Sequence, residues 1–337
     1  MTSFPEDVKG ELRDRVDVGY MDMALDLAKQ GRGRTSPNPM VGAVVVKDGR
    51  ILGRGFHAKA GAPHAEVCAL EEAGEEARGA TLYVTLEPCC HYGRTPPCTK
   101  RIIEVGIRKV VVAMEDPNPL VAGKGLRELR NSGIDVEIGV REEKARRLNE
   151  AFVKYITTRR PFMLLKMAMS MDGKIATKTG ESKYITGQEA REAVARLRDE
   201  YDAVMVGIGT ILADDPMLTT RLPGDRGRDP VRIILDTHCR IPLNCNVVRL
   251  ARRGSGAPGG GSDAPTWIVT TDEAPHEKVQ ALTGAGADVL IVPARDGHVD
   301  LALLMDELGR REITSVLVEG GATLAASLLR EGLVDKI

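Results

Sequence analysis

The sequence predicts an α/β protein made of two domains. The chain has 337 residues, and domains usually run to about 100–200 residues, so two domains are the natural expectation. Apolar runs typical of buried strands, such as MVGAVVV from Met40 and SVLVE from Ser315, alternate with amphipathic helical patterns in both halves. This alternation is typical of helices packed on a mostly parallel sheet.

The first half contains closely spaced helix and strand patterns. The expected helices cover residues 20–30, 64–77, 98–106 and 123–133. The expected strands cover residues 41–46, 51–58, 80–88, 109–116 and 135–140. The turn residues Asp48 and Gly49 predict that the first two strands form a hairpin.

A charged stretch, residues 141–161, links the two halves, and we place the boundary between domains 1–159 and 160–337. Beyond it, strand and helix patterns alternate again, from FMLLKMAMS at Phe162 to ATLAASLLREG at Ala322. The run RRGSGAPGGGSDAP, residues 252–265, is expected to be a surface loop without chemistry. There is no internal repeat, so the halves are expected to be different domains.

Composition excludes several classes of protein. The formal net charge is −1, from 47 basic and 48 acidic residues, which argues against a nucleic-acid binder. The charged N-terminus is no signal peptide, and no run approaches the roughly 18 apolar residues of a membrane span. Six cysteines without a secretory signal indicate metal binding or catalysis rather than disulfides. We therefore expect a cytoplasmic protein without a membrane partner.

Three residues in the first half have the character of zinc ligands. Zinc prefers a tetrahedral set of imidazole and thiolate ligands, and a catalytic site leaves one position for water. His64 begins an expected helix, Cys89 follows an expected strand, and Cys98 follows the Pro96–Pro97 turn at the start of another helix. Glu66, two residues after His64, could lie beside the bound water without being a ligand.

Other metal-capable residues offer alternatives. Cys68 lies four residues after His64 and shares its helix face, so it is a rival ligand, although a lone helical cysteine is usually a small buried apolar residue. A purely structural zinc would need a fourth protein ligand, and Cys68 is the candidate for it. Glu66 favours the open, catalytic site instead. Cys90 and His91 are assigned packing and loop roles.

The pattern H-x-E followed by P-C-x-x-C is the signature of zinc nucleobase deaminases, with the Glu as proton shuttle. Here eight residues, not two, separate Cys89 from Cys98. With this long spacing, PNPMVGAVVVKDG, GAPHAEVCAL, YVTLEPCCHYGRTPPC and EDPNPLVAGKG resemble the deaminase half of the bifunctional riboflavin-biosynthesis deaminase/reductase family. The resemblance implies a cytidine-deaminase-like three-layer domain, zinc on His64, Cys89 and Cys98, and Glu66 as the proton donor.

The implied reaction is hydrolytic loss of the C2 amino group from a diamino-pyrimidinone ribosylamine 5′-phosphate. The family-like turns also contain polar residues, and we hypothesise that some of them hold the base or the phosphate: Asn38, His57, Arg94 and Asn118. For His57, a capping or exposed histidine is an equally good interpretation.

The second half has weaker motifs of its own. SVLVEGGATLAASLL reads as a strand, a Gly-Gly turn and a helix, which could offer backbone N–H groups to a phosphate, although an ordinary tight turn has the same pattern. Together with MSMDGKIA, GESKYITG and TILADDPMLTTR, it resembles the reductase half of the same family, a dihydrofolate-reductase-like domain that uses NADPH.

The resemblance implies two sets of contacts in this half. The expected NADPH contacts are Ala168, Tyr184, Thr210, Asp214, Thr237, Gly321, Ala322, Thr323, Leu324, Ala325, Ala326 and Ser327. The expected substrate contacts are Ser182, Arg198, Leu218, Arg221 and Glu319. Guanidinium forks grip phosphate oxygens bidentately, so Arg198 and Arg221 suit the ribose 5-phosphate. The implied chemistry is hydride delivery to ribose C1′, which opens the sugar to a ribityl chain.

The expected protein is thus a zinc- and NADPH-dependent bifunctional enzyme that acts on a small molecule and forms a homo-oligomer. The chain stops at EGLVDKI, where the family normally continues, so we expect a truncated reductase domain. Two other functions compete. One is a zinc deaminase acting on nucleic acid, with an accessory, non-reducing C-terminal domain. The other is a zinc-stabilised, non-catalytic scaffold with a nucleotide-binding module.

Overall fold

The computed structural model divides into two compact units, Met1–Thr158 and Arg159–Ile337. It describes residues 6–92, 96–178, 185–222, 224, 227–251 and 262–337, with side chains from residue 16 onward. Among these residues, no helix has the length and apolar character needed to cross a bilayer. Most of the expected loop 252–265 lies outside the described residues.

The first unit has a five-stranded sheet in the order β2-β1-β3-β4-β5. The strands are β1 (Gly42–Lys47), β2 (Arg50–Phe56), β3 (Thr81–Val84), β4 (Lys109–Val112) and β5 (Asp135–Ile138). The helices are α1 (Glu6–Ala28), α2 (Ala65–Ala73), α3 (Cys98–Val105), α4 (Lys124–Asn131), α5 (Glu142–Leu148) and α6 (Glu150–Thr158). Short 3₁₀ turns, Lys29–Gly31 and Gly74–Ala77, follow α1 and α2.

This sheet is mixed, so the prediction of a mostly parallel sheet was wrong for the first half. β1 pairs antiparallel with both β2 and β3, whereas the β3–β4 and β4–β5 pairs are parallel. The predicted hairpin at Asp48–Gly49 is confirmed. Its two-residue turn forces β1 and β2 to run in opposite directions, whereas parallel strands need a longer crossover.

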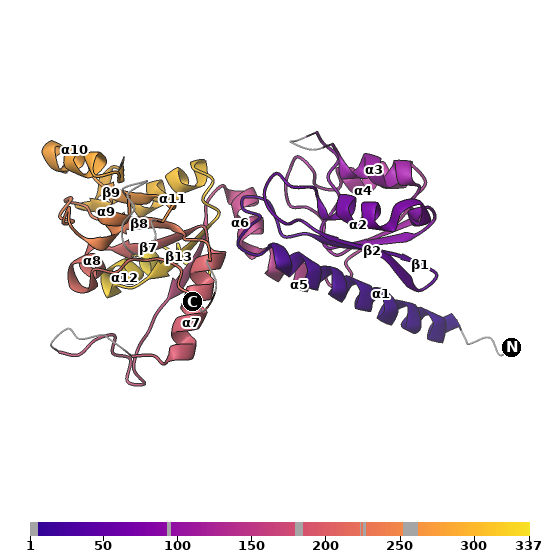
Figure 1. Ribbon diagram of the computed structural model, residues 1–337, viewed down its shortest axis with the longest axis horizontal. Coiled ribbons are helices and arrows are strands. Elements are labelled where there is room, and N and C mark those ends of the chain that lie inside the picture. The colour runs from indigo at the N-terminus through magenta and orange to yellow at the C-terminus, as the bar shows by residue number, and fades with distance from the viewer. Residues whose placement is uncertain (1–5, 93–95, 179–184, 223, 225–226, 252–261) are drawn as a thin grey trace. The chain divides into compact units, whose positions relative to one another are not determined.

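Helices cover both faces of the first sheet and make three layers (Figure 1). On one face, Ala65, Ala69 and Leu70 of α2 pack with α3 and α4 against Val45 and other strand residues. On the other face, α1 and α5 pack against the alternate strand residues, including Val44. Because successive strand side chains point to opposite faces, β1 contributes to both cores.

The second unit has a six-stranded sheet in the order β10-β9-β8-β7-β13-β6, and every pair in it is parallel. The strands are β6 (Phe162–Lys166), β7 (Ala203–Gly207), β8 (Val231–Leu235), β9 (Thr266–Thr270), β10 (Asp288–Ile291) and β13 (Ser315–Glu319). A small ribbon pairs β11 (Ala294–Arg295) with β12 (His298–Val299). Lys336 also forms a parallel bridge with Leu164.

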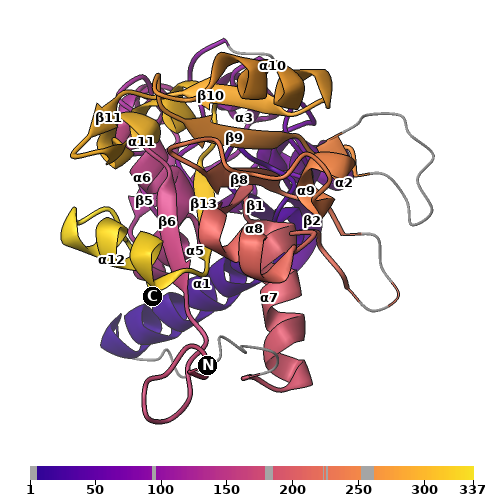
Figure 2. The ribbon, with the colours of Figure 1, turned by 90° about the vertical axis from the view of Figure 1, so that its left-hand side faces the viewer.

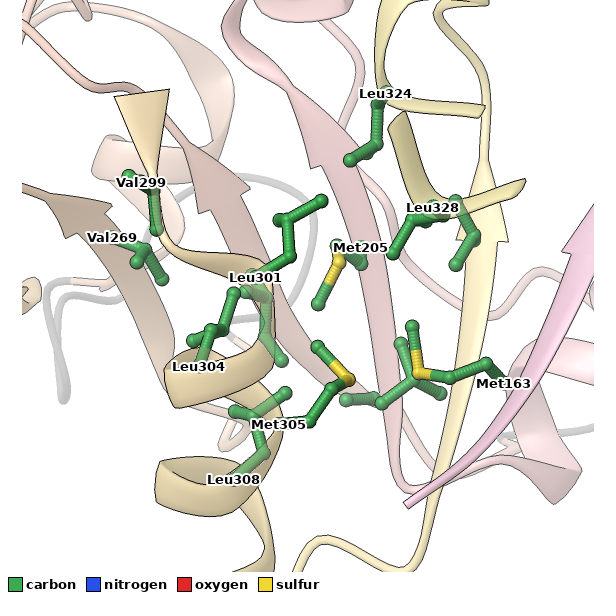
Figure 3. Close-up of a cluster of buried hydrophobic side chains, with 14 of the residues drawn as sticks. Met163, Met205, Val269, Val299, Leu301, Leu304, Met305, Leu308, Leu324 and Leu328 are labelled. Carbon is green, nitrogen blue, oxygen red and sulfur yellow. The ribbon is translucent and has the colours of Figure 1, made fainter. Parts of the chain in front are cut away.

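Helices cover both faces of this sheet as well: α7 (Gln188–Glu200), α8 (Ile208–Asp214), α9 (Asn246–Ala251), α10 (His276–Gly284), α11 (Leu301–Arg310) and α12 (Ala322–Arg330). Figure 2 shows α11 and α12 on one side of the strands and α8 and α9 on the other. Figure 3 shows the core under α11 and α12, where Met163, Met205 and Met305 meet leucines of both helices. All the carboxyl ends of these parallel strands lie at one edge of the sheet, where ligands of such folds bind.

Candidate metal centre and cofactor edge

Three different elements bring His64, Cys89 and Cys98 together. His64 is the extended residue that precedes α2, with φ −74° and ψ 159°. Cys89 lies in the turn that follows β3, and Cys98 is the first residue of α3. The amino ends of two helices therefore converge on the group, and their positive dipole ends favour thiolates.

The spacing of the three side chains fits a zinc ion. His64 Nδ1 lies 3.2 Å from Cys98 Sγ and 3.6 Å from Cys89 Sγ. In a tetrahedral site, zinc bonds of about 2.0 Å to nitrogen and about 2.3 Å to sulfur separate the two ligand atoms by roughly 3.6 Å. All three ligand atoms lie within 4.8 Å of one another. The donor set and its spacing therefore fit a three-ligand zinc site.

The electrostatics of the group suit a cation and a proton carrier. The hydrogen bond with Cys98 lowers the pKa of Cys89 to about 4. The backbone N–H of Cys98 also donates to Cys89 Sγ, at 3.4 Å. Glu66 is 4% exposed, and burial, followed by the nearby Cys89, raises its pKa to about 7. A carboxyl with this pKa can both hold and release a proton near neutral pH.

The rival ligands lie outside this group. Within the part of the chain that the structure describes, His64, Cys89 and Cys98 form the metal-capable cluster, and Cys68 and Cys90 do not join it. Cys68 is half-buried where α2 crosses β2, and its Cβ lies 2.8 Å from the position that a Cβ on Gly55 would take. Cys68 therefore packs against the sheet, as a small apolar residue would.

A matched pair of cysteine variants tests this assignment. Cys98→Ala is expected to lose stoichiometric zinc, because two protein ligands hold the ion much more weakly than three. Cys68→Ala, which removes another cysteine of the first unit, is expected to keep one zinc per chain. Metal analysis of both purified proteins, after passage over a weak chelator, measures the difference. Zinc loss from Cys68→Ala would show that Cys68 is a ligand.

Polar side chains beside the cluster are linked to one another. His57 is buried, its Nδ1 lies 3.1 Å from the Pro63 carbonyl oxygen, and its Nε2 lies 3.1 Å from Asn38 Nδ2. With Nδ1–H donating to Pro63, Nε2 accepts from the Asn38 amide, which fits the lowering of the His57 pKa by burial. The exposed or capping interpretation of His57 was therefore wrong. Arg94 lies outside the described residues.

The loop after β4 holds a buried carboxyl that the sequence interpretation missed. Asp116 Oδ1 accepts from the backbone N–H of Asn118 at 2.8 Å, and burial raises the Asp116 pKa to about 6. Asn118 Oδ1 in turn accepts from the backbone N–H of Leu120. A signal was present in the string EDPNP, where Asp and Asn flank a proline and form tight turns.

In the second unit, the expected NADPH residues follow the carboxyl ends of neighbouring strands. Ala168 follows β6, Thr210 and Asp214 lie in α8 after β7, and Thr237 follows β8. The stretch 321–327 follows β13, and Thr210 Oγ1 lies 3.4 Å from the position of a Cβ on Gly320. The left-handed φ of Gly320, +92°, is one that L side chains rarely adopt.

The stretch 321–327 forms the first turns of α12. Gly321 precedes the helix, and its φ of 79° is also left-handed. Leu324 and Ala325 are buried in the core, whereas Gly321, Ala322 and Thr323 are exposed. The first N–H groups of a helix have no acceptor inside it, so this turn offers donors to an anion. The expected NADPH contact Tyr184 lies outside the described residues.

The expected substrate residues include a mostly buried ion pair. Arg198 Nε donates to Glu319 Oε1 at 2.6 Å, and Nη2 donates to Oε2 at 2.8 Å. Arg198 Nη1 also donates to the Thr219 carbonyl oxygen, at 2.9 Å. Leu218 is buried in the apolar core with φ 55°, and Arg221 is exposed. Ser182 lies outside the described residues. The pairing of Arg198 with Glu319 was not predicted.

Two family models match this chain. Residues 14–114 match the cytidine and deoxycytidylate deaminase zinc-binding region, and residues 161–337 match the RibD C-terminal domain. The first match covers His64, Glu66, Cys89 and Cys98, and the second covers nearly the whole of the second unit.

Curated relatives match the chain over almost its whole length. The riboflavin biosynthesis protein RibD of Aquifex aeolicus (strain VF5) is 50% identical over 323 residues, which is 96% of this chain and 85% of that protein. The same protein of Escherichia coli (strain K12) is 44% identical over 332 residues, 95% of this chain and 86% of that one.

Solved structures agree with these relatives. Acinetobacter baumannii RibD (form 1) superposes with a TM-score of 0.83 at 43% identity and covers 96% of this chain and 85% of that one. A diaminohydroxyphosphoribosylaminopyrimidine deaminase/5-amino-6-(5-phosphoribosylamino)uracil reductase from Thermotoga maritima gives a TM-score of 0.82 at 42% identity, covering 95% and 85% of the two chains. The cytidine-deaminase-like first domain and the reductase-like second domain that the sequence predicted are confirmed.

Proposed function

This chain belongs to the RibD family of riboflavin biosynthesis proteins, a family of bifunctional deaminase/reductases, and we propose that its two units deaminate and then reduce one pyrimidine ribosylamine 5′-phosphate. The first substrate is 2,5-diamino-6-(5-phosphoribosylamino)pyrimidin-4(3H)-one. Zn²⁺ and NADPH are the cofactors of the two steps. The observation that carries the deamination is the cluster of His64, Cys89 and Cys98 with the buried carboxyl of Glu66 beside it.

In the first step, water replaces the C2 amino group and ammonia leaves. When bound, zinc lowers the pKa of a water ligand to about 7. The Glu66 carboxyl passes the first proton of the attacking water to the ring nitrogen, and the second, from the hydroxyl then on C2, to the departing amine. The C2 carbon is left as a carbonyl. One carboxyl performs both transfers, which suits a pKa near 7 in a buried position.

Polar groups near the cluster orient the pyrimidine in this proposal. The Asn38 amide, held by His57, and the Asp116–Asn118 turn offer hydrogen-bonding groups for this purpose. A pyrimidine with amino, carbonyl and ring N–H groups can be recognised by such donors and acceptors.

In the second step, the ribosyl group is reduced to ribityl. NADPH supplies a hydride to ribose C1′ in the open, Schiff-base form of the sugar. The first turn of α12 and Thr210 would hold the anionic part of the cofactor at the carboxyl edge of the sheet. Glu319, held by Arg198, faces the ribose, and the exposed Arg221 faces its 5-phosphate. We also propose that the enzyme is cytoplasmic and homo-oligomeric.

One assay tests the proposal as a whole. The zinc-loaded protein is given the diamino-pyrimidinone ribosylamine 5′-phosphate with NADPH, and ammonia and absorbance at the NADPH band are followed together. We expect ammonia release first and NADPH oxidation that depends on it. If the protein released ammonia from RNA or DNA but not from the pyrimidine phosphate, a nucleic-acid deaminase would be the better conclusion.

A further inference from the structure

A single buried carboxylate joins the metal-binding turn to the helix behind it. Glu87 is 3% exposed and lies two residues before Cys89. Its Oε2 accepts from the backbone N–H groups of Asp116 (3.2 Å) and Gly123 (2.9 Å). Its Oε1 accepts from those of Gly125 (2.9 Å) and Leu126 (3.3 Å). Both oxygens are therefore fully engaged by backbone donors.

Glu87 supplies the cap that α4 lacks. The residue before the helix is Gly123, whose φ is 73°, and no side chain of its own segment caps the helix. Uncapped N–H groups in a buried first turn are costly, and a carboxylate there also interacts favourably with the helix dipole. The capping group comes instead from a residue 36 positions earlier than Gly123.

The turn that carries Cys89 lies directly on α4. A Cβ on Gly125 would lie 2.2 Å from the Pro88 carbonyl oxygen, so only a residue without a side chain allows the approach. Cys98 is linked to α4 through its neighbour, because Thr99 Oγ1 donates to Glu128 Oε2 at 2.8 Å. Thus α4 is a common support for the turns of Cys89 and Cys98.

We propose that Glu87 is a positioning residue of the deaminase, a role that rests on the deamination proposed above. By holding α4 and the Asp116–Asn118 turn against the segment 87–89, it fixes Cys89 relative to the other two ligands. It also fixes the polar turn that borders the cluster. Glu87 touches neither the metal nor the substrate. Its effect on the reaction passes through the placement of these groups.

Glu87→Gln is the sharpest test of this role. The amide has nearly the same shape, but one oxygen becomes an NH₂ group. In either orientation of the amide, its NH₂ group faces two backbone N–H donors. It cannot accept from them, so two hydrogen bonds are lost. We therefore expect the turn to separate from α4 locally, while the remaining oxygen keeps its two bonds.

The main readout is zinc release to a chromogenic chelator from the fully loaded protein, followed by stopped flow. We expect Glu87→Gln to release zinc about 10–100-fold faster than the wild type, the usual effect of losing a group that orients a metal ligand. Ammonia release at saturating zinc and substrate is expected to fall in kcat by a similar factor. Substrate-dependent NADPH oxidation, with deaminated product supplied, is expected to stay unchanged.

Two further variants separate positioning from general destabilisation. Gly125→Ala pushes the same two segments apart from the helix side, without changing a charge, and should reproduce faster zinc release. Asp17→Asn removes another buried carboxylate of the first unit, on the opposite face of the sheet, where Asp17 accepts from the Tyr83 hydroxyl. It should lower the melting temperature without accelerating zinc release.

The outcomes distinguish the alternatives. Wild-type zinc release from Glu87→Gln, or equally fast release from Asp17→Asn, would overturn the positioning role. Absence of ammonia release from the wild type would instead remove the proposed deamination, and the zinc measurement would still decide whether Glu87 places the ligands.

Discussion

Glu66→Gln is expected to lower ammonia release by about 10²–10⁴-fold, the range that a positioned general acid–base group contributes. The amide cannot accept the proton of the attacking water, and it cannot deliver protons to the ring nitrogen or to the leaving amine. Zinc content should stay at one per chain, because Glu66 is not among the clustered ligand atoms. The measurement is the initial rate of ammonia release from the pyrimidine phosphate at saturating substrate.

Glu71→Gln is the matched control for this variant. Glu71 lies on the same helix, α2, and carries the same functional group, but it is exposed to solvent. Its rate of ammonia release should equal that of the wild type. Both variants should oxidise NADPH normally when the deaminated product is supplied.

The result also decides between the competing functions. A non-catalytic scaffold would release no ammonia even as the wild type, whereas unchanged ammonia release by Glu66→Gln would remove Glu66 from the mechanism. The position of Glu66 argues against that outcome, because its carboxyl is 4% exposed and hydrogen-bonds with Cys98, so it lies at the cluster where a proton carrier would act.

The sequence predicted which side chains of the first unit lie together better than it predicted the topology. His64, Cys89 and Cys98 are separated by up to 34 positions, yet their residue types and their places at element ends were enough to group them. Strand direction, in contrast, is not encoded in an apolar run. A buried strand such as β1 has the same pattern whether its neighbours are parallel or antiparallel, so the antiparallel pairing of β1 with β3 was missed.

Partnerships between polar residues were the other feature beyond the reach of the sequence. Glu87 stands in the string TLEPC between an apolar strand and a metal ligand. That position shows that a carboxylate is buried there, but not that its partners are backbone groups 29 to 39 positions away. The pairing of Arg198 with Glu319 spans 121 positions and depends on β13 lying beside β7, an order that local patterns do not specify.

That pairing changes what is expected of Arg198. Considered alone, Arg198 suits the ribose phosphate, but its Nε and Nη2 are both directed at Glu319, and its Nη1 at a carbonyl oxygen. The side chains of Arg198 and Glu319 are only 12% and 11% exposed. Leaving one charge of such a pair without its partner typically costs about 2–5 kcal/mol. The two residues are therefore expected to act as a unit.

A double-mutant cycle on the reductase reaction tests this expectation. Arg198→Ala and Glu319→Ala should each lower kcat/KM for NADPH-dependent reduction by about 30-fold or more, following the cost of an unpaired buried charge. The double variant should be no slower than the slower single variant, because the second substitution removes a charge that has already lost its partner. Trp267, the single tryptophan, lies on β9. Its fluorescence reports whether the second unit stays folded.

Arg221→Ala provides the contrast, because Arg221 is exposed and should contribute mainly to binding. Its substitution should raise KM for the phosphorylated substrate with little change in kcat, and its effect should add to that of Glu319→Ala. If the Arg198 and Glu319 effects also added, Arg198 would grip the phosphate independently of Glu319. Non-additivity would instead mean that Arg198 holds the Glu319 carboxylate in place beside the Gly320–Gly321 turn, so that the carboxylate, and not the guanidinium, faces the sugar.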